Sequence, residues 1–284
     1  MNFSVIGPGR VGAALAKRLS DGGWKLIGLA AGSLDSASRA ADWIGAGRAF
    51  ETPSDAVRGA DVVFLTVPDR CIEPVCTAVA EAHAFEKGAS VIHTSGAMPA
   101  EILSAARSLC ECRVASMHPL QSFASPESAL RLFPASFFAV EGDEQAVEVA
   151  RNVVTLLAGR FVQIRSSAKT LYHAGACVAS NYLVALADVA VELLQEAGIP
   201  RDTALEMLLP LVQGTVSNLR QIGLPHALTG PVARGDRDTV EQHLEAIGRS
   251  APEVLDIYRI MHERAARIAE EMKSKRQVEQ GEQQ

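Results

Sequence analysis

Lys169 and His173, two side chains that can carry an exchangeable proton, stand four residues apart in the segment AKTLYHAG. In a helix this spacing places them on adjacent turns of one face. Hydride addition to a carbonyl or imine leaves an oxygen or nitrogen that needs a proton, and lysine or histidine can supply it. The pair is therefore a candidate acid–base site. The alternative is that Lys169 begins its helix in solvent and that His173 is a satisfied core histidine.

A third candidate, His118, follows the run 113–117, which is predicted to be a strand, and begins the motif HPLQSF. Ligands of open α/β sheets bind beyond the carboxyl ends of the strands. His118 could therefore face a cleft and hydrogen-bond a substrate or a cofactor amide. His93 also ends a predicted strand, but we expect it to be buried there, which favours His118.

The motif GPGRVG has the spacing GxGxxG, follows an apolar run and begins a helical pattern. Gly7 permits a tight turn, Gly9 lets the backbone approach a pyrophosphate, and Gly12 allows close packing of helix against strand. The N-terminus of the helix offers unpaired N–H groups to the phosphates. The alternative is a turn that only joins strand to helix. We predict that the whole motif binds a dinucleotide: Gly7, Pro8, Gly9, Arg10, Val11 and Gly12.

The end of the second predicted strand decides between NAD and NADP. An NAD-binding domain usually carries an acidic residue there, which accepts the ribose hydroxyls. The sequence at this point is LAAGS, without an acid. Ser33, Ser36 and Arg39 could instead bind the 2′-phosphate of NADP through hydroxyl groups and a charge-assisted contact. The alternative is that the serines only cap the next helix. The sequence therefore predicts NADP.

Two later strand ends point toward the nicotinamide end of such a cofactor. The motif VPD follows the buried run FLT, and TSG follows the run 90–93. Asp69 could instead simply cap a helix, and Pro68 could simply end a strand. Because ligands bind at strand ends, we expect five residues to line the cofactor site: Val67, Pro68, Asp69, Thr94 and Ser95.

These residues require an α/β scaffold to position them. Through the first half of the chain, β-rich runs alternate with helical patterns, as in βαβ units with a parallel sheet. The predicted strands cover residues 3–6, 26–30, 61–67, 90–93, 113–117, 136–140 and 161–164. Beyond them, apolar residues recur at helical spacing, and the first long helix is predicted to reach residue 197. We predict a Rossmann domain over 1–166, an all-α domain over 167–272 and a disordered tail over 273–284.

Charge and composition narrow the range of partners. A net charge of -6 argues against nucleic acid, and no basic amphipathic stretch suggests a membrane surface. The apolar stretch 174–194 contains Asn181, Asp188 and Glu192, which a membrane span rarely tolerates. We therefore expect a buried helix of a cytoplasmic protein without a secretory signal. The five cysteines lack zinc-site spacing, so no metal is expected.

Several motifs occur in a characteristic order along nearly the whole chain: GPGRVG, VPD, HTSG, HPLQSF, AKTLYHAG, SNYLVAL and LTGPVARGD. Together they resemble a family of bacterial proteins that pair a Rossmann-like domain with a C-terminal helical domain of unknown function. More distantly, the layout resembles the 6-phosphogluconate dehydrogenase superfamily, which includes ketopantoate reductase and pyrroline-5-carboxylate reductase. The resemblance implies a dinucleotide-binding fold and reductase chemistry.

The hydroxyacid members of that superfamily carry a lysine and an asparagine one turn apart at the start of the first long helix. Lys169 matches the lysine of that pattern, but His173 stands where the asparagine would be. This departure puts the catalytic role of the pair in doubt. Asn181, two turns later, is a candidate substitute.

The main hypothesis is an NADP(H)-dependent oxidoreductase that reduces a small oxo or imino acid, by analogy with ketopantoate. The substitution at His173 keeps open an alternative, a non-catalytic NADP-binding sensor or regulatory protein. Another nucleotide-like ligand, such as a methyl donor, is a third hypothesis. Because the first long helix is apolar on many faces, we also predict a homodimer through the C-terminal helices.

Overall fold

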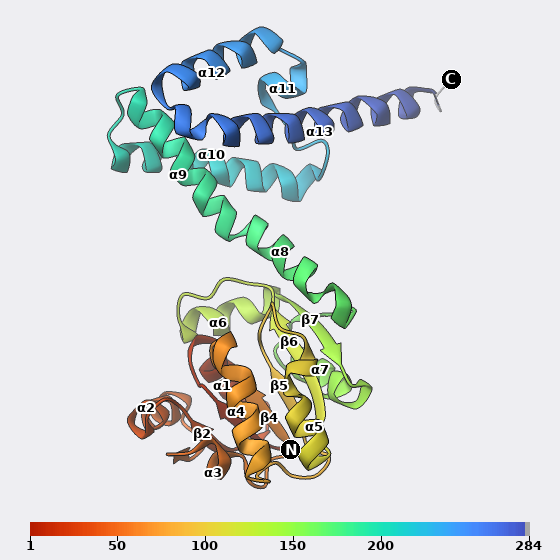
Figure 1. The fold of residues 1–284 in the computed structure, drawn as a ribbon. Helices are drawn as coiled ribbons and strands as arrows, with labels where there is room; N and C mark the ends of the chain where they lie inside the picture. Colours follow the sequence, from red (N-terminus) through yellow and green to blue (C-terminus); the bar gives the residue numbers. More distant parts are fainter. Residues whose placement is uncertain (282–284) are drawn as a thin grey trace. The chain divides into compact units, whose positions relative to one another are not determined.

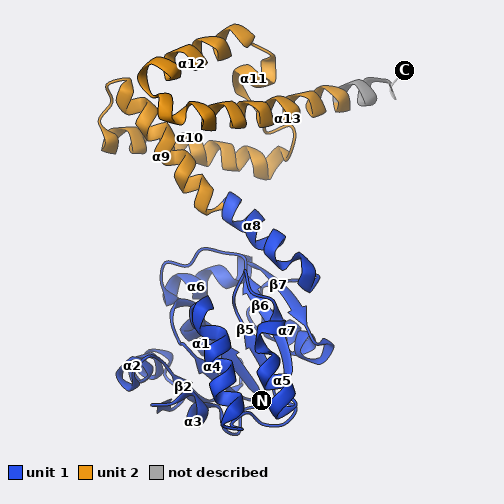
Figure 2. Ribbon diagram, viewed as in Figure 1, with its two compact units in different colours: residues 1–179 blue, residues 180–284 orange. Residues whose placement is uncertain are grey.

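The computed structural model describes residues 1–281, with side chains through residue 275, and forms two compact units (Figure 2). Unit 1 spans Met1–Ala179, and unit 2 begins at Ser180. The boundary therefore lies one helix later than the predicted boundary at residue 166, because helix α8 (Lys169–Ala179) belongs to unit 1.

Unit 1 is built on a single eight-stranded sheet with the order β3-β2-β1-β4-β5-β6-β7-β8. Figure 1 shows this unit in the red to green part of the chain. Neighbouring strands are parallel except for β6 and β7, which are antiparallel. The strands are β1 (Asn2–Ile6), β2 (Lys25–Ala30), β3 (Ala49–Phe50), β4 (Val62–Leu65), β5 (Ser90–His93), β6 (Arg113–Pro119), β7 (Phe137–Gly142) and β8 (Arg160–Gln163). This doubly wound arrangement confirms the predicted α/β class.

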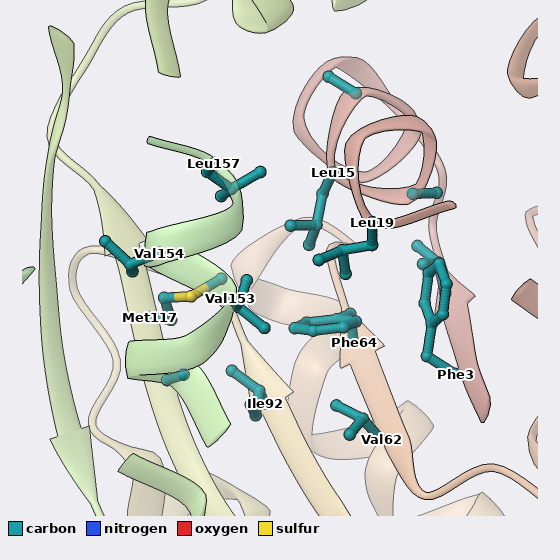
Figure 3. Packing of buried hydrophobic residues seen from close by; sticks show 14 of the residues in the cluster. Phe3, Leu15, Leu19, Val62, Phe64, Ile92, Met117, Val153, Val154 and Leu157 are labelled. Atoms are coloured by element: carbon teal, nitrogen blue, oxygen red, sulfur yellow. The ribbon is translucent and has the colours of Figure 1, made fainter. Parts of the chain in front are cut away.

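Helices cover both faces of this sheet. The helices of unit 1 before α8 are α1 (Arg10–Asp21), α2 (Leu34–Ile44), α3 (Pro53–Val57), α4 (Asp69–Glu81), α5 (Ser104–Cys110), α6 (Pro126–Leu132) and α7 (Glu144–Leu156). All four residues of β4 are buried, as expected for a central parallel strand. The side chains that pack on one face come from the sheet, from α1 and from α7 (Figure 3), and include Phe3, Leu15, Leu19, Phe64, Ile92, Met117, Val153 and Leu157.

Unit 2 contains only helices among its described residues. They are α9 (Asn181–Glu196), α10 (Arg201–Ile222), α11 (Gly230–Arg234), α12 (Arg237–Ser250) and α13 (Leu255–Gly281). A small apolar cluster that includes Ile247, Ala251 and Val254 packs against Leu193 of α9 and Tyr258 of α13. The predicted all-α character of this part of the chain is confirmed.

The long apolar segment differs from the prediction in two respects. The expected single helix is divided into α8 and α9, with Ser180 between them. The expectation that the segment is buried is wrong, because only 6% of its most apolar window is buried within the chain. By length and composition alone, residues Ser166–Glu196 could cross a membrane, a test that core helices of soluble proteins also pass. Apolar residues such as Leu171 and Val184 are therefore exposed along this segment.

The predicted disordered tail is also corrected. Helix α13 continues through residue 273 to Gly281. The segment KSKRQVEQ is polar, but lysine, arginine, glutamine and glutamate are good helix formers, and no proline interrupts them. The last part of the predicted tail, 282–284, lies outside the described residues.

Candidate active site

The glycine motif forms the turn between β1 and α1. Gly7 has a φ of 83°, and its N–H donates to Ala30 O over 2.8 Å. Thr66 Oγ1, just after β4, donates to Gly7 O over 2.6 Å. A Cβ on Gly12 would overlap Thr66 Oγ1. Gly12 is therefore required for α1 to lie this close to β4, as predicted for a packing glycine.

Gly9 differs from Gly7 and Gly12 because no other atoms pack closely against the position that its side chain would occupy. It is the N-cap of α1, with a φ of -80° that any residue can adopt. A Cβ placed on Gly9 would meet nothing closer than Gly7 O at 3.9 Å. The N-terminus of α1 thus presents backbone N–H groups at an uncovered surface, which is the geometry that binds phosphate.

A cavity of about 660 Å³ adjoins this turn within unit 1. It brings together residues from three of the predicted cofactor segments, and Cys71 and Val75 of α4 also face it. The predicted cofactor residues that line it are Gly7, Pro8, Gly9, Ser36, Val67 and Pro68. The cavity therefore fits the dinucleotide that the glycine spacing predicts.

Ser33, Ser36 and Arg39 lie in and before the first turns of α2. Ser33 is the N-cap, and its Oγ accepts the Ser36 N–H over 3.2 Å, so the capping alternative holds for Ser33. Arg39 Nη2 donates to Ser36 Oγ over 3.1 Å, and Nη1 forms an ion pair with Asp35. Both partners of that ion pair are exposed, so it contributes only about 0–1 kcal/mol. An incoming phosphate can therefore compete with Asp35 for the guanidinium.

The predicted strand-end residues Asp69, Thr94 and Ser95 interact with the backbone around them. Asp69 is the first residue of α4, where its charge favours the helix dipole. Ser95 Oγ accepts the N–H groups of Ala97 and Met98, each over 3.1 Å. Thr94 N donates to Leu65 O over 3.3 Å. Ser95 is therefore engaged in shaping the loop that follows β5.

His93 is a structural histidine. It is fully buried, its Nδ1 accepts the Ser95 N–H over 3.1 Å, and its Nε2 lies 3.2 Å from Pro99 O. Burial and the charge on Lys169 lower the pKa of His93 to about 3. Both ring nitrogens of His93 are therefore occupied, and its expected burial is confirmed.

Lys169 is buried at the start of α8 and is only 1% exposed, so it does not begin the helix in solvent. Its Nζ donates to Ser116 Oγ and lies 3.9 Å from Glu141 Oε1. Burial lowers the pKa of Lys169 to about 8, although the charges of Glu141 and Asp69 oppose this shift. Lys169 therefore fixes α8 to β6 and β7, and its burial favours a role as an anchor and a fixed charge over direct proton transfer.

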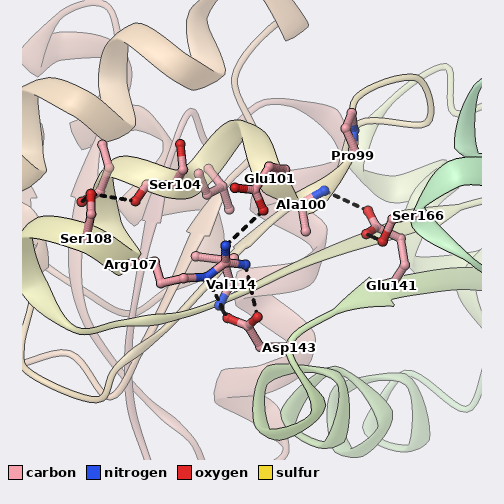
Figure 4. A network of polar contacts seen from close by, with 12 residues as sticks. Pro99, Ala100, Glu101, Ser104, Arg107, Ser108, Val114, Glu141, Asp143 and Ser166 are labelled. Atoms are coloured by element: carbon pink, nitrogen blue, oxygen red, sulfur yellow. Dashed lines mark hydrogen bonds and ion pairs between the residues drawn. The ribbon is translucent and has the colours of Figure 1, made fainter.

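Glu141, the carboxylate beside Lys169, also forms hydrogen bonds with Ala100 and Ser166 (Figure 4). Its Oε1 accepts the Ala100 N–H over 2.7 Å, and its Oε2 accepts the Ser166 hydroxyl over 2.6 Å. Glu141 is 2% exposed, so loss of Lys169 would leave a buried carboxylate without its cation. Such a loss costs about 3–5 kcal/mol of stability. A substitution of Lys169 alone would thus change stability and charge together.

Three rings meet beside Gly96, at the carboxyl end of β5. His118 Nδ1 lies 2.8 Å from the Tyr172 hydroxyl, and the His118 and His173 rings are 6.3 Å apart. A Cβ on Gly96 would lie 2.8 Å from His118 Nε2 and 2.6 Å from His173 Cδ2. Gly96 is therefore the residue that allows both imidazoles to reach this strand end.

The remaining candidate, Asn181, is exposed at the first residue of α9 and belongs to unit 2. The other three catalytic candidates, His118, Lys169 and His173, come together within unit 1. Sequence reasoning missed four residues of this site: Gly96, Ser116, Glu141 and Tyr172. Tyr172 carried a usable signal, because it is three residues after Lys169 on the same helix.

Comparison with known proteins agrees with the two-part organisation. Residues 1–119 match the family model of a Rossmann-like domain, and residues 136–265 match a domain of unknown function (DUF2520). No curated protein matches the chain.

Solved structures similar to this chain include protein TM1727 from Thermotoga maritima, with 27% identity, a TM-score of 0.77, and coverage of 95% of this chain and 99% of that one. The 1-pyrroline-5-carboxylate reductase of Streptococcus pyogenes is 18% identical, with a TM-score of 0.63 and coverage of 94% and 98%. The pyrroline carboxylate reductase of Plasmodium falciparum, with NADP bound, is 12% identical, with a TM-score of 0.57 and coverage of 95% and 98%. The two reductases share the fold with this chain.

Proposed function

We infer that this chain, which joins a Rossmann-like domain to a DUF2520 domain, is an oxidoreductase that uses NADP(H) to reduce a small oxo or imino acid. One observation carries the proposal. The open glycine turn and the cluster of His118, Tyr172 and His173 both lie at the carboxyl edge of the same sheet. That edge is where doubly wound folds place a dinucleotide and its substrate. The likeness to two pyrroline carboxylate reductases, one of them with NADP bound, supports the same reading.

In this proposal, different residues of unit 1 bind the cofactor and donate the proton. The glycine turn would hold the pyrophosphate of NADPH at the N-terminus of α1, and the cofactor would supply the hydride. His118 donates the proton, because its Nε2 faces the strand end at Gly96 and has no hydrogen-bond partner among the described residues. Burial and the charges on Lys169 and His173 lower the pKa of His118 to about 4, so the ring is neutral at pH 7. A neutral imidazole can polarise a carbonyl and protonate the oxyanion that forms.

Lys169 and His173 support this step in different ways. Lys169 holds α8 against the sheet and keeps a positive charge close to His118. His173 lies beside Gly96 and is placed to contact the substrate.

The first prediction concerns cofactor choice. Arg39→Ala should weaken NADPH binding by about tenfold, which corresponds to the loss of one charge-assisted contact of about 1.5 kcal/mol. NADH lacks the 2′-phosphate, so its affinity should stay nearly unchanged. Isothermal titration calorimetry with each cofactor measures the dissociation constants of NADPH and NADH. Arg151→Ala is a matched control, because Arg151 forms a similar ion pair with Glu148 on α7, over 3.2 Å. Equal affinity of the unmodified protein for NADPH and NADH would exclude a 2′-phosphate site.

The second prediction concerns assembly. We propose that a second copy of the chain covers the apolar faces of α9 and α10, where Val184 is 71% exposed and Leu211 is 66% exposed. Burial of such residues is worth about 1.5–3 kcal/mol each. Light scattering at micromolar concentration should give the mass of a dimer. Val184→Lys combined with Leu211→Lys should give a monomer with an unchanged circular dichroism spectrum. A monomer before any substitution would refute the proposal.

A further inference from the structure

The hydroxyl of Tyr172 contacts Nδ1 of His118, on the opposite side of the ring from Nε2, which faces the proposed substrate. The two side chains come from different elements, β6 and α8, and the distance from Tyr172 Oη to His118 Nδ1 is 2.8 Å. Their rings are perpendicular, with an interplanar angle of 82° and centroids 5.7 Å apart. The anchor of α8 at Lys169 fixes this contact, because Lys169 precedes Tyr172 by less than one turn.

This contact determines which nitrogen of His118 carries the proton. The Tyr172 hydroxyl has one proton, and His118 Nδ1 is its one hydrogen-bond partner among the described residues. If the phenol donates to Nδ1, the proton of the neutral ring must be on Nε2, which faces Gly96. The reverse arrangement would leave the phenol proton without a protein acceptor and Nε2 without a proton to give. The hydrogen bond therefore favours the tautomer that can act on a substrate.

We propose that Tyr172 is the positioning residue and proton source for His118, in a relay from Tyr172 through His118 to the substrate. This inference rests on the proposed function. As the hydride reaches the substrate carbon, the C=O or C=N π pair moves to the heteroatom. The heteroatom takes the proton from His118 Nε2, and Nδ1 takes the proton from Tyr172. The ring ends neutral as the other tautomer. To reset the site, His118 Nε2 takes a proton from solvent and Nδ1 returns its proton to the tyrosinate. The ring is then again the Nε2-protonated tautomer, and Tyr172 is again a phenol.

The surroundings keep each member of the relay in the required state. The groups that face His118 are Tyr172, His173 and Lys169 from α8 and His93 from β5. With a pKa of about 4, His118 is neutral above that pH. Burial raises the pKa of Tyr172 to about 12, so the phenol keeps its proton in the resting protein. Removal of the phenol donor takes away a bond to the neutral ring, so the pKa of His118 should rise.

The test is Tyr172→Phe, followed by two measurements. Nitrogen NMR of the imidazoles, with the His118 signals assigned by their loss in His118→Gln, should show Nδ1 bare and Nε2 protonated in the unmodified protein with NADP+ bound. In Tyr172→Phe this tautomer preference should be lost, and the pKa of His118 should move upward. The turnover number should fall by about 10²-fold, the lower end of the range for a positioned acid. NADPH affinity should not change.

A matched control exists in unit 2. Tyr258 Oη lies 2.7 Å from His243 Nδ1, the same kind of contact outside the proposed site, so Tyr258→Phe should leave turnover unchanged. Protonated Nδ1 on His118 in the unmodified protein would overturn the proposal whether or not the protein is active. Unchanged turnover and an unchanged pH profile in Tyr172→Phe would also overturn it. If the unmodified protein transferred no hydride, the proposed function would fail together with the relay, and the NMR result would still report the hydrogen bond.

Discussion

His118→Ala should lower the turnover number by about 10²–10⁴, the usual contribution of a positioned general acid. NADPH affinity should change little, because the glycine turn that we propose as the phosphate site lies on β1 and α1 rather than on β6. The expected loss follows from the geometry of the ring, whose Nδ1 is held by Tyr172 at 2.8 Å and whose Nε2 faces the strand end at Gly96. Steady-state kinetics and a fluorescence titration of NADPH measure the two quantities separately.

His243→Ala is the matched control for this experiment. His243 is also a histidine bonded to a tyrosine, but it lies on α12 in unit 2. Its removal should leave turnover unchanged. If His118→Ala folds, binds NADPH and turns over within about threefold of the unmodified protein, another group donates the proton, and the assignment to His118 fails. Substitution of Lys169 is a weaker test, because it also leaves Glu141 buried without its cation.

Gly9→Ala should weaken NADPH binding by about 10–10²-fold without unfolding the protein. The added Cβ meets only Gly7 O at 3.9 Å, and the φ of -80° suits alanine, so the cofactor-free protein accommodates it. At this N-cap position, the change from glycine to alanine should cost less than about 1 kcal/mol of stability. The methyl group would nevertheless occupy the side from which the pyrophosphate approaches the backbone. Loss of one or two charge-assisted hydrogen bonds accounts for the expected decrease in affinity.

Two other glycines provide the comparison. Gly12→Ala should lower the melting temperature even without cofactor, because its Cβ would overlap Thr66 Oγ1. Gly214→Ala lies inside α10 and adds a Cβ with nothing within 4 Å, so it should raise stability by about 0.5–1 kcal/mol and leave NADPH affinity unchanged. If Gly9→Ala bound NADPH as well as the unmodified protein does, the pyrophosphate would not lie at this turn.

The sequence predicted the α/β scaffold well because its strongest signals are local. The buried run of β4 and the spacing of Gly7, Gly9 and Gly12 depend on neighbours in the chain, and both led to the right elements. The two-residue strand β3 escaped detection because so short a run has no periodicity. The antiparallel direction of β7 depends on how the chain returns to the sheet, which strand propensity does not encode.

The candidate catalytic residues were harder to place from the sequence than the glycine turn. The spacing of Lys169 and His173 put both on one helix face, but it could not show that Lys169 would be buried by Ser116 and Glu141 from two other strands. Such a network forms between elements distant in sequence. The position of His118 at a strand end was informative, whereas its bond to Tyr172 required the fold. The exposure of α8 and α9 was not predicted because an apolar helix pattern does not show whether the helix is buried within its own chain.

The central claim, reduction of an oxo or imino acid by NADPH, is tested most directly by following deuterium from the cofactor. The unmodified protein is incubated with NADPH labelled with deuterium at either face of C4, together with a panel that includes ketopantoate and 1-pyrroline-5-carboxylate. We predict that mass spectrometry will find one deuterium in the product of at least one substrate, from one face of the nicotinamide only, and that His118→Ala will slow its appearance. Tight binding of NADPH with no deuterium in any product would contradict the claim and favour a non-catalytic NADP-binding sensor.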